Sequence, residues 1–392
     1  MHLVVYSHKD IWPDPESEFG YVTDGGFSFQ MKAISELFDQ TTLVLPLSPK
    51  AKPKGLIPLQ GKNLRIQPLS PLRGKGWHRK LRLPYWFLRN SLTLSRSLHK
   101  ADAVHAAIPG DVGTFGMVFG RLSGKPLFVR YCGNWMVTQT ALERFWKWFM
   151  RSCTKPHQVM LATGASLQPP SPEAPHVQWI FSSSVSQAQM LRLRGTVRQH
   201  PGLAPRVIIV GRQEQAKGTA ILIQALHDLL PEYPGLSLEV VGDGSALAEF
   251  KDLTARLQMT DRVAFLGKIP QPQVIEHLQK AHLFCFPTYS SEGFPKVVLE
   301  ALACGLPVVT TKVSALPMVI GQGGGVLMED ATPTSCKSAI KQVLDQKDQY
   351  PLLSQQALDV AKNYSLEAWR DQIGTYLSQA WNMSLAKESG SK

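Results

Sequence analysis

Residues 292–309 read EGFPKVVLEALACGLPVV, and this stretch decides the fold class of the chain. A loop with glycine and proline comes first, and an apolar stretch with helical spacing follows it. Gly305 and Pro307 end that stretch, and a β-branched run begins at Val308. A helix that leads through a tight turn into an apolar strand is a repeating part of a parallel sheet. The stretch therefore predicts an α/β fold.

The same alternation of strand and helix extends through the second half of the chain. We predict strands at residues 207–210, 236–241, 263–266, 282–286 and 308–311, with helices at 218–230, 246–259, 273–280 and 299–303. Glycine or proline directly follows the first four strands, which places tight turns at their ends. The pattern predicts a doubly wound parallel sheet, and such a sheet binds ligands beyond the carboxyl ends of its strands.

The first half is similar but less regular. We predict strands at residues 2–6, 42–45, 103–107 and 127–131 and a helix at 29–38, with long irregular stretches between them. A chain of 392 residues exceeds the size of one ordinary core, so two Rossmann-like domains are expected. A run with few apolar pairs places the boundary near residue 202. The expected domains are residues 1–202, completed by a helix at 365–386, and residues 203–364.

Composition narrows the class of protein. The chain is 44% hydrophobic and 18% charged, as in a globular protein, and no apolar run is long enough to cross a bilayer. The apolar run after Met1 is too short for a signal peptide, so we expect a cytoplasmic protein. The five cysteines form no Cys-x-x-Cys pair and are expected to be free. No cluster of His, Asp and Cys has metal-ligand spacing, so no metal is expected.

The positive charge lies in the first half. Residues 1–200 carry 25 Lys and Arg against 11 Asp and Glu, whereas residues 201–392 carry 17 against 19. There is no acidic residue between Asp39 and Asp102, where a basic stretch from Arg73 to Lys100 is interleaved with aromatic residues. Anionic lipid or nucleic acid fits this pattern, and a solvated basic face without a partner is the third interpretation. Lipid is preferred because the chain has no recognisable motif for reading nucleic acid.

The opening stretch also carries two carboxylates, eight residues apart across a junction of loop and helix. Gly293 lets the backbone come close to a ligand, and the N-terminus of the following helix favours an anion such as a diphosphate. Glu292 can accept hydrogen bonds from sugar hydroxyls, and Glu300 can accept them from the two hydroxyls of a ribose. A ligand with phosphate between two polyols satisfies both. For Glu292 alone, a helix-end charge is the better interpretation.

A second pair of charges follows the strand at 207–210. Arg212 comes directly after Gly211 at the strand exit, and Lys217 opens the next helix. Two cations five residues apart at this place can clamp a diphosphate, although each alone is also typical of a surface side chain. Gly242 and Leu266 mark two further strand ends, where backbone amides could hold a base or a phosphate.

In this order and spacing, these residues resemble the retaining glycosyltransferases of family 4, which have the GT-B fold. The resemblance covers most of residues 203–380. It implies two Rossmann-like domains that face a central cleft, a UDP- or GDP-sugar donor in the C-terminal domain, and no required cofactor or metal. It places Arg212 and Lys217 on the diphosphate, Glu292 beside the transferred sugar and Glu300 on the ribose. The expected donor-binding residues are Gly211, Arg212, Lys217, Gly242, Leu266, Glu292, Gly293, Phe294 and Glu300, of which Glu292, Arg212 and Lys217 are the expected catalytic residues.

The N-terminal half resembles the family less closely. Gly25 and Gly26, before a predicted helix, are similar to the family's early glycine loop beside the acceptor. The family often has His-x-His beyond its fourth strand, whereas this chain has His105-Ala106-Ala107, so His105 is either an acceptor contact or a core histidine. Asn134 or Tyr131 stands where the family often shows another histidine, and either is a candidate acceptor contact.

The resemblance implies transfer of a sugar to a hydroxyl acceptor with retention at the anomeric carbon, in cell-surface polysaccharide or glycolipid synthesis. A lipid-linked or glycan acceptor at the inner face of the cell membrane also explains the basic first half. Two alternatives stay open: a nucleotide-sugar epimerase of the same fold, and a binding protein that keeps the donor site without catalysis.

Overall fold

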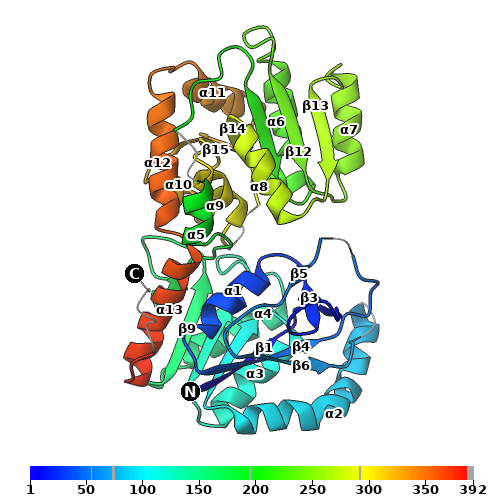
Figure 1. Cartoon of the computed structure of the whole chain (residues 1–392), viewed down its shortest axis with the longest axis vertical. Coiled ribbons are helices and arrows are strands. Elements are labelled where there is room, and N and C mark those ends of the chain that lie inside the picture. The colour runs from blue at the N-terminus through cyan, green and yellow to red at the C-terminus, as the bar shows by residue number, and fades with distance from the viewer. Residues whose placement is uncertain (54, 73–75, 194–196, 291–292, 386–392) are drawn as a thin grey trace. The chain divides into compact units, whose positions relative to one another are not determined.

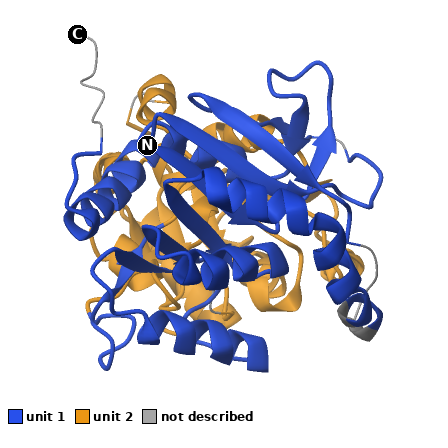
Figure 2. Cartoon of the chain, turned by 90° about the horizontal axis from the view of Figure 1, so that it is seen from below, with its two compact units in different colours: residues 1–164, 168–181, 366–392 blue, residues 165–167, 182–365 orange. Residues whose placement is uncertain are grey.

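The computed structural model describes residues 1–53, 55–72, 76–193, 197–290 and 293–385 (Figure 1). The chain divides into two compact units (Figure 2). The first unit holds Met1–Gly164, Gln168–Phe181 and the C-terminal segment from Leu366, and the second holds Ala165–Leu167 and Ser182–Ser365. Residues 182–202, which the sequence assigns to the N-terminal domain, thus lie in the second unit.

A seven-stranded parallel sheet forms the centre of the first unit, in the order β10-β9-β8-β7-β1-β4-β6. Its strands are β1 (His2–Ser7), β4 (Gln40–Pro46), β6 (Leu64–Leu69), β7 (Ala103–Ile108), β8 (Leu127–Tyr131), β9 (Gln158–Thr163) and β10 (Val177–Ile180). A small antiparallel sheet is built from β2 (Ile11–Pro13), β3 (Tyr21–Thr23) and β5 (Ile57–Pro58). The strand order reverses between β1 and β7, which is the switch point where a doubly wound sheet opens a crevice.

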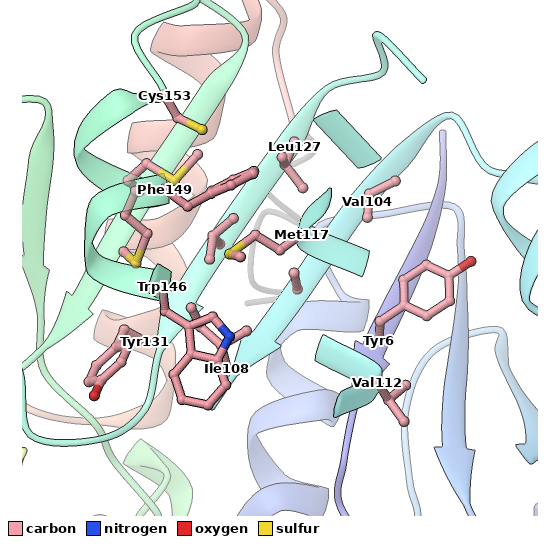
Figure 3. Packing of buried hydrophobic residues seen from close by; sticks show 14 of the residues in the cluster. Tyr6, Val104, Ile108, Val112, Met117, Leu127, Tyr131, Trp146, Phe149 and Cys153 are labelled. Atoms are coloured by element: carbon pink, nitrogen blue, oxygen red, sulfur yellow. The ribbon is translucent and has the colours of Figure 1, made fainter. Parts of the chain in front are cut away.

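Helices cover both faces of this sheet. The helices α2 (Gly76–Lys100), α3 (Asp111–Leu122) and α4 (Ala141–Ser152) share one buried cluster with it, and α1 (Phe27–Ser35) and α13 (Leu366–Trp381) share the other. Figure 3 shows Met117 of α3 and Trp146 of α4 packed over the strands of the first cluster. Because both faces are covered, the central strands β1, β7, β8 and β9 are buried along almost their whole length, whereas the edge strands β6 and β10 are partly exposed.

Helix α2 occupies a stretch that the sequence leaves irregular. Arg73–Lys75 lie outside the described residues, and the helix runs from Gly76 with Pro84 inside it. The indole of Trp86 donates to the Ser70 carbonyl at 2.7 Å, and the buried Asn90 amide exchanges hydrogen bonds with Ser70. These bonds hold the inner face of α2 to the end of β6.

The second unit has a six-stranded parallel sheet in the order β13-β12-β11-β14-β15-β16. Its strands are β11 (Arg206–Val210), β12 (Ser237–Val241), β13 (Val263–Gly267), β14 (Leu283–Phe286), β15 (Val308–Thr310) and β16 (Gly325–Leu327). The order reverses between β11 and β14, which gives this unit a switch point of its own. Two parallel doubly wound sheets confirm the predicted α/β fold.

The helices of the second unit form two groups, one on each face of the sheet (Figure 1). Helix α6 (Thr219–His227) packs against α7 (Leu247–Arg256) and α11 (Pro333–Leu344), and α9 (Lys296–Ala303) packs against α8 (Gln271–Lys280) and α12 (Tyr350–Lys362). Shorter elements are α5 (Gln187–Leu193), α10 (Leu316–Ile320) and a 3₁₀ turn at Gln215–Lys217. None of the described helices combines the length and apolar character needed to cross a bilayer. The five cysteines are free, and four of them are buried.

Candidate functional site

The switch point of the second unit brings two loops together, one after β11 and one after β14. Gly218 has φ +80°, and a Cβ at this position would lie 2.1 Å from the Pro287 carbonyl oxygen. The amides of Tyr289 and Ser290 both donate to the Ala216 carbonyl, at 3.0 and 3.3 Å. Only glycine allows this approach, so Gly218 sets the width of the junction between the two loops.

Lys217 lies buried at this junction, with only 4% of its surface exposed. Its ammonium group donates to the Ser290 hydroxyl at 3.0 Å. The Thr288 hydroxyl donates to the Ala216 carbonyl at 3.0 Å and so ties the same two loops one residue away. A cation in this place is held by the protein before any ligand arrives, which is the preorganisation that electrostatic stabilisation requires.

Arg212 is held differently. Its side chain is 73% exposed and forms an ion pair with the partly exposed Glu214 at 2.9 Å. An ion pair between exposed side chains contributes little, so an incoming anion can replace Glu214 at small cost. The two cations predicted as a clamp therefore comprise one fixed charge, Lys217, and one adaptable charge, Arg212.

Gln213 lies between the two cations in the chain, and its side chain is fully buried. Its amide nitrogen donates to the carbonyls of Gly211 and Val241, both at 3.0 Å, and its amide oxygen accepts from the Thr219 hydroxyl at 2.8 Å. It thereby ties the ends of β11 and β12 to the start of α6. Gln213 was not predicted from the sequence, because a polar residue in a loop has no pattern that distinguishes a buried side chain.

Gly242 closes the end of β12 against the loop after β11. It has φ +120°, and a Cβ there would lie 1.8 Å from the Gly211 carbonyl oxygen. Its amide donates to the Gly267 carbonyl at 2.8 Å, and the Gly244 amide donates to the Asp243 carboxylate at 2.7 Å. These two amides are used within the protein, and the absence of a side chain at Gly242 allows the close approach of the two loops.

Leu266 lies at an irregularity in the sheet. The register with β12 passes from Phe265 opposite Val240 to Gly267 opposite Val241, so Leu266 has no partner in that register and its side chain is half-buried. A bulge at the end of a strand re-aims a side chain. Because β11, β12 and β13 run parallel, Leu266 lies at the same carboxyl edge of the sheet as Gly211 and Gly242.

Glu300 lies in α9 with its carboxyl group buried. The Ser184 hydroxyl donates to its Oε1 at 2.8 Å, and the Gln271 amide donates to the same oxygen at 3.3 Å. Burial raises the pKa of Glu300, and these two hydrogen bonds and Lys296 oppose that shift. Among the described residues both bonds fall on Oε1, which leaves Oε2 as the oxygen that can accept from a ligand. Neither Ser184 nor Gln271 was predicted.

Arg198 anchors the C-terminal end of α9, the helix that carries Glu300. Its guanidinium group donates to the Cys304 carbonyl twice, at 3.0 and 2.9 Å, and to carbonyls at the end of α8, those of Leu278 and Gln279, at 3.0 and 2.9 Å. A cation is favourable at the C-terminus of a helix, and here one cation serves two helices. The sequence places Arg198 in a linker, where nothing marks it.

The loop before α9 is described in part. The predicted catalytic Glu292 lies outside the described residues. Phe294 is buried, with its ring 5.7 Å from that of Tyr364. Pro295 precedes the first residue of α9, and no side chain among the described residues caps this helix start. The Val298 amide donates to the Pro295 carbonyl at 3.1 Å, and the positive end of the helix dipole favours an anion at this place.

The predicted acceptor-side residues lie in the first unit, on different elements. Gly25, with φ +64°, and Gly26 form the turn into α1. His105 is completely buried in β7, stacked at 3.9 Å on Phe128, and burial lowers its pKa well below the usual range. This is the setting of a core histidine. Asn134 accepts a hydrogen bond from the Met136 amide at 2.9 Å.

A polar cavity of about 630 Å³ lies at the switch point of the first unit, where β1, β4 and β7 end. Its lining includes His8, Lys9, Asp10, Asp24, Arg79 and Asp111. Gly110 has φ +140°, and a Cβ there would lie 2.4 Å from the His8 ring, so the cavity wall depends on this glycine. Of the predicted acceptor residues, Gly25 and Gly26 directly follow a lining residue, Asp24. Within the described part of the chain, no three His, Cys, Asp or Glu side chains gather as metal ligands would.

Comparison with known proteins relates part of the second unit to a known family. The family model described as Glycosyl transferases group 1 matches residues 197–359. These residues are similar to the glycosyl transferases group 1 domain. The group 1 domain contains Arg198, Arg212, Lys217, Gln271 and Glu300, whereas Ser184 lies before it.

Curated relatives match the same half of the chain. A D-inositol 3-phosphate glycosyltransferase of Segniliparus rotundus is 32% identical over 188 residues, which cover 46% of this chain and 42% of the relative. The same enzyme of Corynebacterium efficiens is 29% identical over 181 residues, 44% of this chain and 42% of the relative. One subunit of the human phosphatidylinositol N-acetylglucosaminyltransferase is 29% identical over 150 residues, 38% of this chain and 30% of the relative. The matches span less than half the length of each relative.

Solved structures match almost the whole chain. Anabaena HepE in complex with UDP and glucose has a TM-score of 0.68 at 16% identity, over 96% of this chain and 99% of that one. A glycosyltransferase of Rickettsia africae has a TM-score of 0.70 at 13% identity, over 97% and 98%. WaaG, a glycosyltransferase involved in lipopolysaccharide biosynthesis, has a TM-score of 0.63 at 16% identity, over 95% and 98%. Together with the two parallel sheets, these matches show the predicted GT-B fold.

Proposed function

We propose that the protein is a retaining glycosyltransferase of family 4 that moves a sugar from a nucleotide-sugar donor to a hydroxyl acceptor. One observation carries the proposal. The buried cation Lys217 bonds to Ser290 in the loop that leads to α9, and α9 carries the buried carboxylate of Glu300. A fixed cation and a buried polyol-binding carboxylate on either side of one loop match a ligand that has phosphate beside a ribose.

In the proposed reaction the acceptor hydroxyl oxygen bonds to the anomeric carbon of the donor sugar. The bond from that carbon to the diphosphate oxygen breaks, and the departing diphosphate takes the hydroxyl proton. Attack on the face that the diphosphate leaves retains the configuration, and no protein nucleophile is required. Lys217, Arg212 and the start of α9 stabilise the charge that develops on the diphosphate.

Two carboxylates, those of Glu300 and Glu292, orient the donor in this proposal. Glu300 accepts hydrogen bonds from the ribose hydroxyls through Oε2, while Ser184 and Gln271 occupy Oε1. Glu292 lies beside the transferred sugar. Gly211, Gly242, Leu266, Gly293 and Phe294 complete the donor site at the carboxyl edge of the sheet. No cofactor or metal is required, because the two cations balance the diphosphate charge.

We take the donor to be a UDP- or GDP-sugar, and the acceptor to be a lipid-linked molecule or a glycan of cell-surface polysaccharide or glycolipid synthesis. Two similar proteins support this. The Anabaena HepE structures contain UDP, glucose or UDP-glucose, and the human relative is named for phosphatidylinositol. The polar cavity beside Asp24 is the place in the first unit for the acceptor hydroxyls. The protein would then work in the cytoplasm at the inner face of the membrane.

The first test is calorimetric titration of the whole protein with UDP, GDP and ADP, repeated with Arg212→Ala and Glu300→Ala. We expect one nucleotide to saturate the protein and both variants to weaken it. Binding that neither substitution changes would overturn the assigned site, and no binding of any nucleotide would overturn the proposed function.

The fate of the nucleotide-sugar distinguishes a glycosyltransferase from an epimerase and from an inactive binding protein. A glycosyltransferase hydrolyses its sugar donor slowly without an acceptor and releases the nucleotide, whereas an epimerase returns an isomeric nucleotide-sugar. Proton NMR of the donor incubated with the protein distinguishes the two. Binding without any change in the donor would support a catalytically inactive binding protein. The epimerase is not favoured, because the relatives that match the group 1 domain are named as transferases.

A further inference from the structure

Helix α2 has an apolar stripe on the side that faces away from its sheet. Leu81, Tyr85, Leu88 and Leu92 are between 67% and 72% exposed. Their spacing of four, three and four residues places them in one row along the helix, opposite the buried Trp86, Asn90 and Leu94. Scattered exposed apolar residues are ordinary, but a continuous row of four marks a contact surface.

A row of arginines runs beside this stripe. Arg82, Arg89 and Arg96 recur every seventh residue, which keeps them on one flank of the row, and all three are exposed. Among the described residues none of them forms an ion pair. Helix α2 contains no acidic residue at all. The surface therefore presents apolar side chains and uncompensated positive charge together.

An apolar groove of about 1140 Å³ lies between α2 and α3 and adjoins this surface. Phe87, Leu94, Phe115 and Phe119 line it, and the Phe115 and Phe119 rings stack at 4.5 Å. Its polar lining residues include the cations Arg96 and Lys100, and a third cation, Lys125, donates to the Leu98 and His99 carbonyls near the end of α2. Phe119 and Leu122 of α3 are exposed and extend the apolar surface. A groove with apolar walls and cationic residues suits a molecule with a hydrocarbon chain and an anionic head.

We propose that α2 and the neighbouring groove dock the protein on an anionic phospholipid bilayer. The leucine row enters the interface between headgroups and acyl chains, the arginines contact lipid phosphates, and the groove accepts the end of an acyl chain. This goes beyond the transfer reaction and does not depend on it. A surface meant only for solvation has no use for four exposed apolar side chains in a row.

The charges also favour a bilayer over a second copy of the chain. A two-fold contact through α2 would bring the same surface of each copy together. The arginine rows would then face a helix without any acidic residue, and like charges across an interface oppose association. Anionic lipid can contact both the exposed apolar row and the arginines beside it.

The test is sedimentation of the full chain with vesicles of phosphatidylglycerol and phosphatidylcholine in equal parts, compared with vesicles of phosphatidylcholine alone. We expect binding to the anionic vesicles that weakens as salt is added. Leu88→Glu with Leu92→Glu removes half of the row, and Arg89→Gln with Arg96→Gln removes two charges. Each pair should lower the partition coefficient about tenfold or more, since both burial of leucine and attraction of basic residues to anionic lipid contribute to binding.

Matched controls exclude general effects of the substitutions. Leu203→Glu with Leu352→Glu places two glutamates at exposed leucines of the second unit, and Arg256→Gln with Arg262→Gln removes two exposed arginines there. Neither control should change vesicle binding, and circular dichroism should show all variants folded. Equal binding of the α2 variants and the wild type would overturn the proposal. If the protein binds no vesicle but sediments as a dimer that the leucine variant separates, the row is instead a contact between copies.

Discussion

The Ser184 hydroxyl donates a hydrogen bond to Glu300 Oε1 at 2.8 Å across 116 positions of the chain. Ser184 lies before the group 1 domain, yet it orients the carboxylate on which the proposed ribose contact depends. With Gln271 on the same oxygen, the side chain has one defined orientation. A serine outside the matched region therefore belongs to the site.

The ionisation of Glu300 makes nucleotide binding dependent on pH. Burial raises its pKa, and the hydrogen bond from Ser184 lowers it. The ionised form accepts from ribose hydroxyls, so affinity should fall as the pH drops through this raised pKa. Ser184→Ala removes a bond that favours the ionised form, so its loss of affinity should begin at a higher pH. Calorimetric titration from neutral to acidic pH measures both profiles, and identical profiles would contradict the role given to Ser184.

Glu300→Gln should weaken nucleotide binding without lowering the thermal stability of the protein. The amide keeps the shape but has no charge, and affinity for the nucleotide should fall about tenfold to a hundredfold, as for the loss of hydrogen bonds to a charged group. A carboxyl group whose folded pKa is raised costs stability above that pKa, so the free energy of unfolding of the wild type decreases as pH rises through it. At neutral pH the variant should thus melt no lower than the wild type. Scanning calorimetry without nucleotide checks this, and a large drop in Tm would refute it.

Lys217→Ala should reduce turnover about a hundredfold or more, because it removes a preorganised cation from the charge that develops on the diphosphate. Lys347→Ala, at an exposed lysine after α11, is the matched control and should leave turnover unchanged. Release of nucleotide from the donor gives the rates. Full activity of the Lys217 variant would remove this residue from the proposed mechanism.

Two glycines at neighbouring strand ends form a matched pair. Gly242→Ala should destabilise by about 3 kcal/mol or more, because its Cβ would lie 1.8 Å from the Gly211 carbonyl oxygen at φ +120°. Gly267→Ala, with φ +65° and nothing within 4 Å, should cost only about 1 kcal/mol. Urea unfolding measures both. Similar losses in the two variants would show that the close contact with Gly211 is not the cause.

Arg198→Met should destabilise by about 2–4 kcal/mol, because it leaves the carbonyls at the ends of α8 and α9 without donors. Nucleotide affinity should also fall, since α9 carries Glu300. Arg198→Lys should restore only part of the loss, because an ammonium group lacks the fork that spans both helices. The control Arg256→Met lies at an exposed position of α7 and should be neutral. Unfolding and titration of the three variants test this, and full rescue by lysine would argue against the two-helix anchor.

Local patterns predicted the second unit well. The predicted strand at 207–210 corresponds to β11 and is one residue shorter. The predicted helix at 273–280 corresponds to α8 and is two residues shorter. The first unit was predicted less completely, and α2 was missed. Pro84 and the dense basic residues weaken its helical signal, and its inner face is recognisable only against the sheet that Trp86 and Asn90 contact.

By itself, the sequence determined the α/β class, the strand ends of the second unit and the charged candidates Arg212, Lys217 and Glu300. These depend on spacing within a few turns of one segment, which backbone geometry translates directly into structure. Only the tertiary structure decided which polar side chains support them. Gln213, Ser184 and Arg198 acquire their roles from partners that parallel strands and their crossovers bring together from distant segments, and the same packing buries His105 in β7.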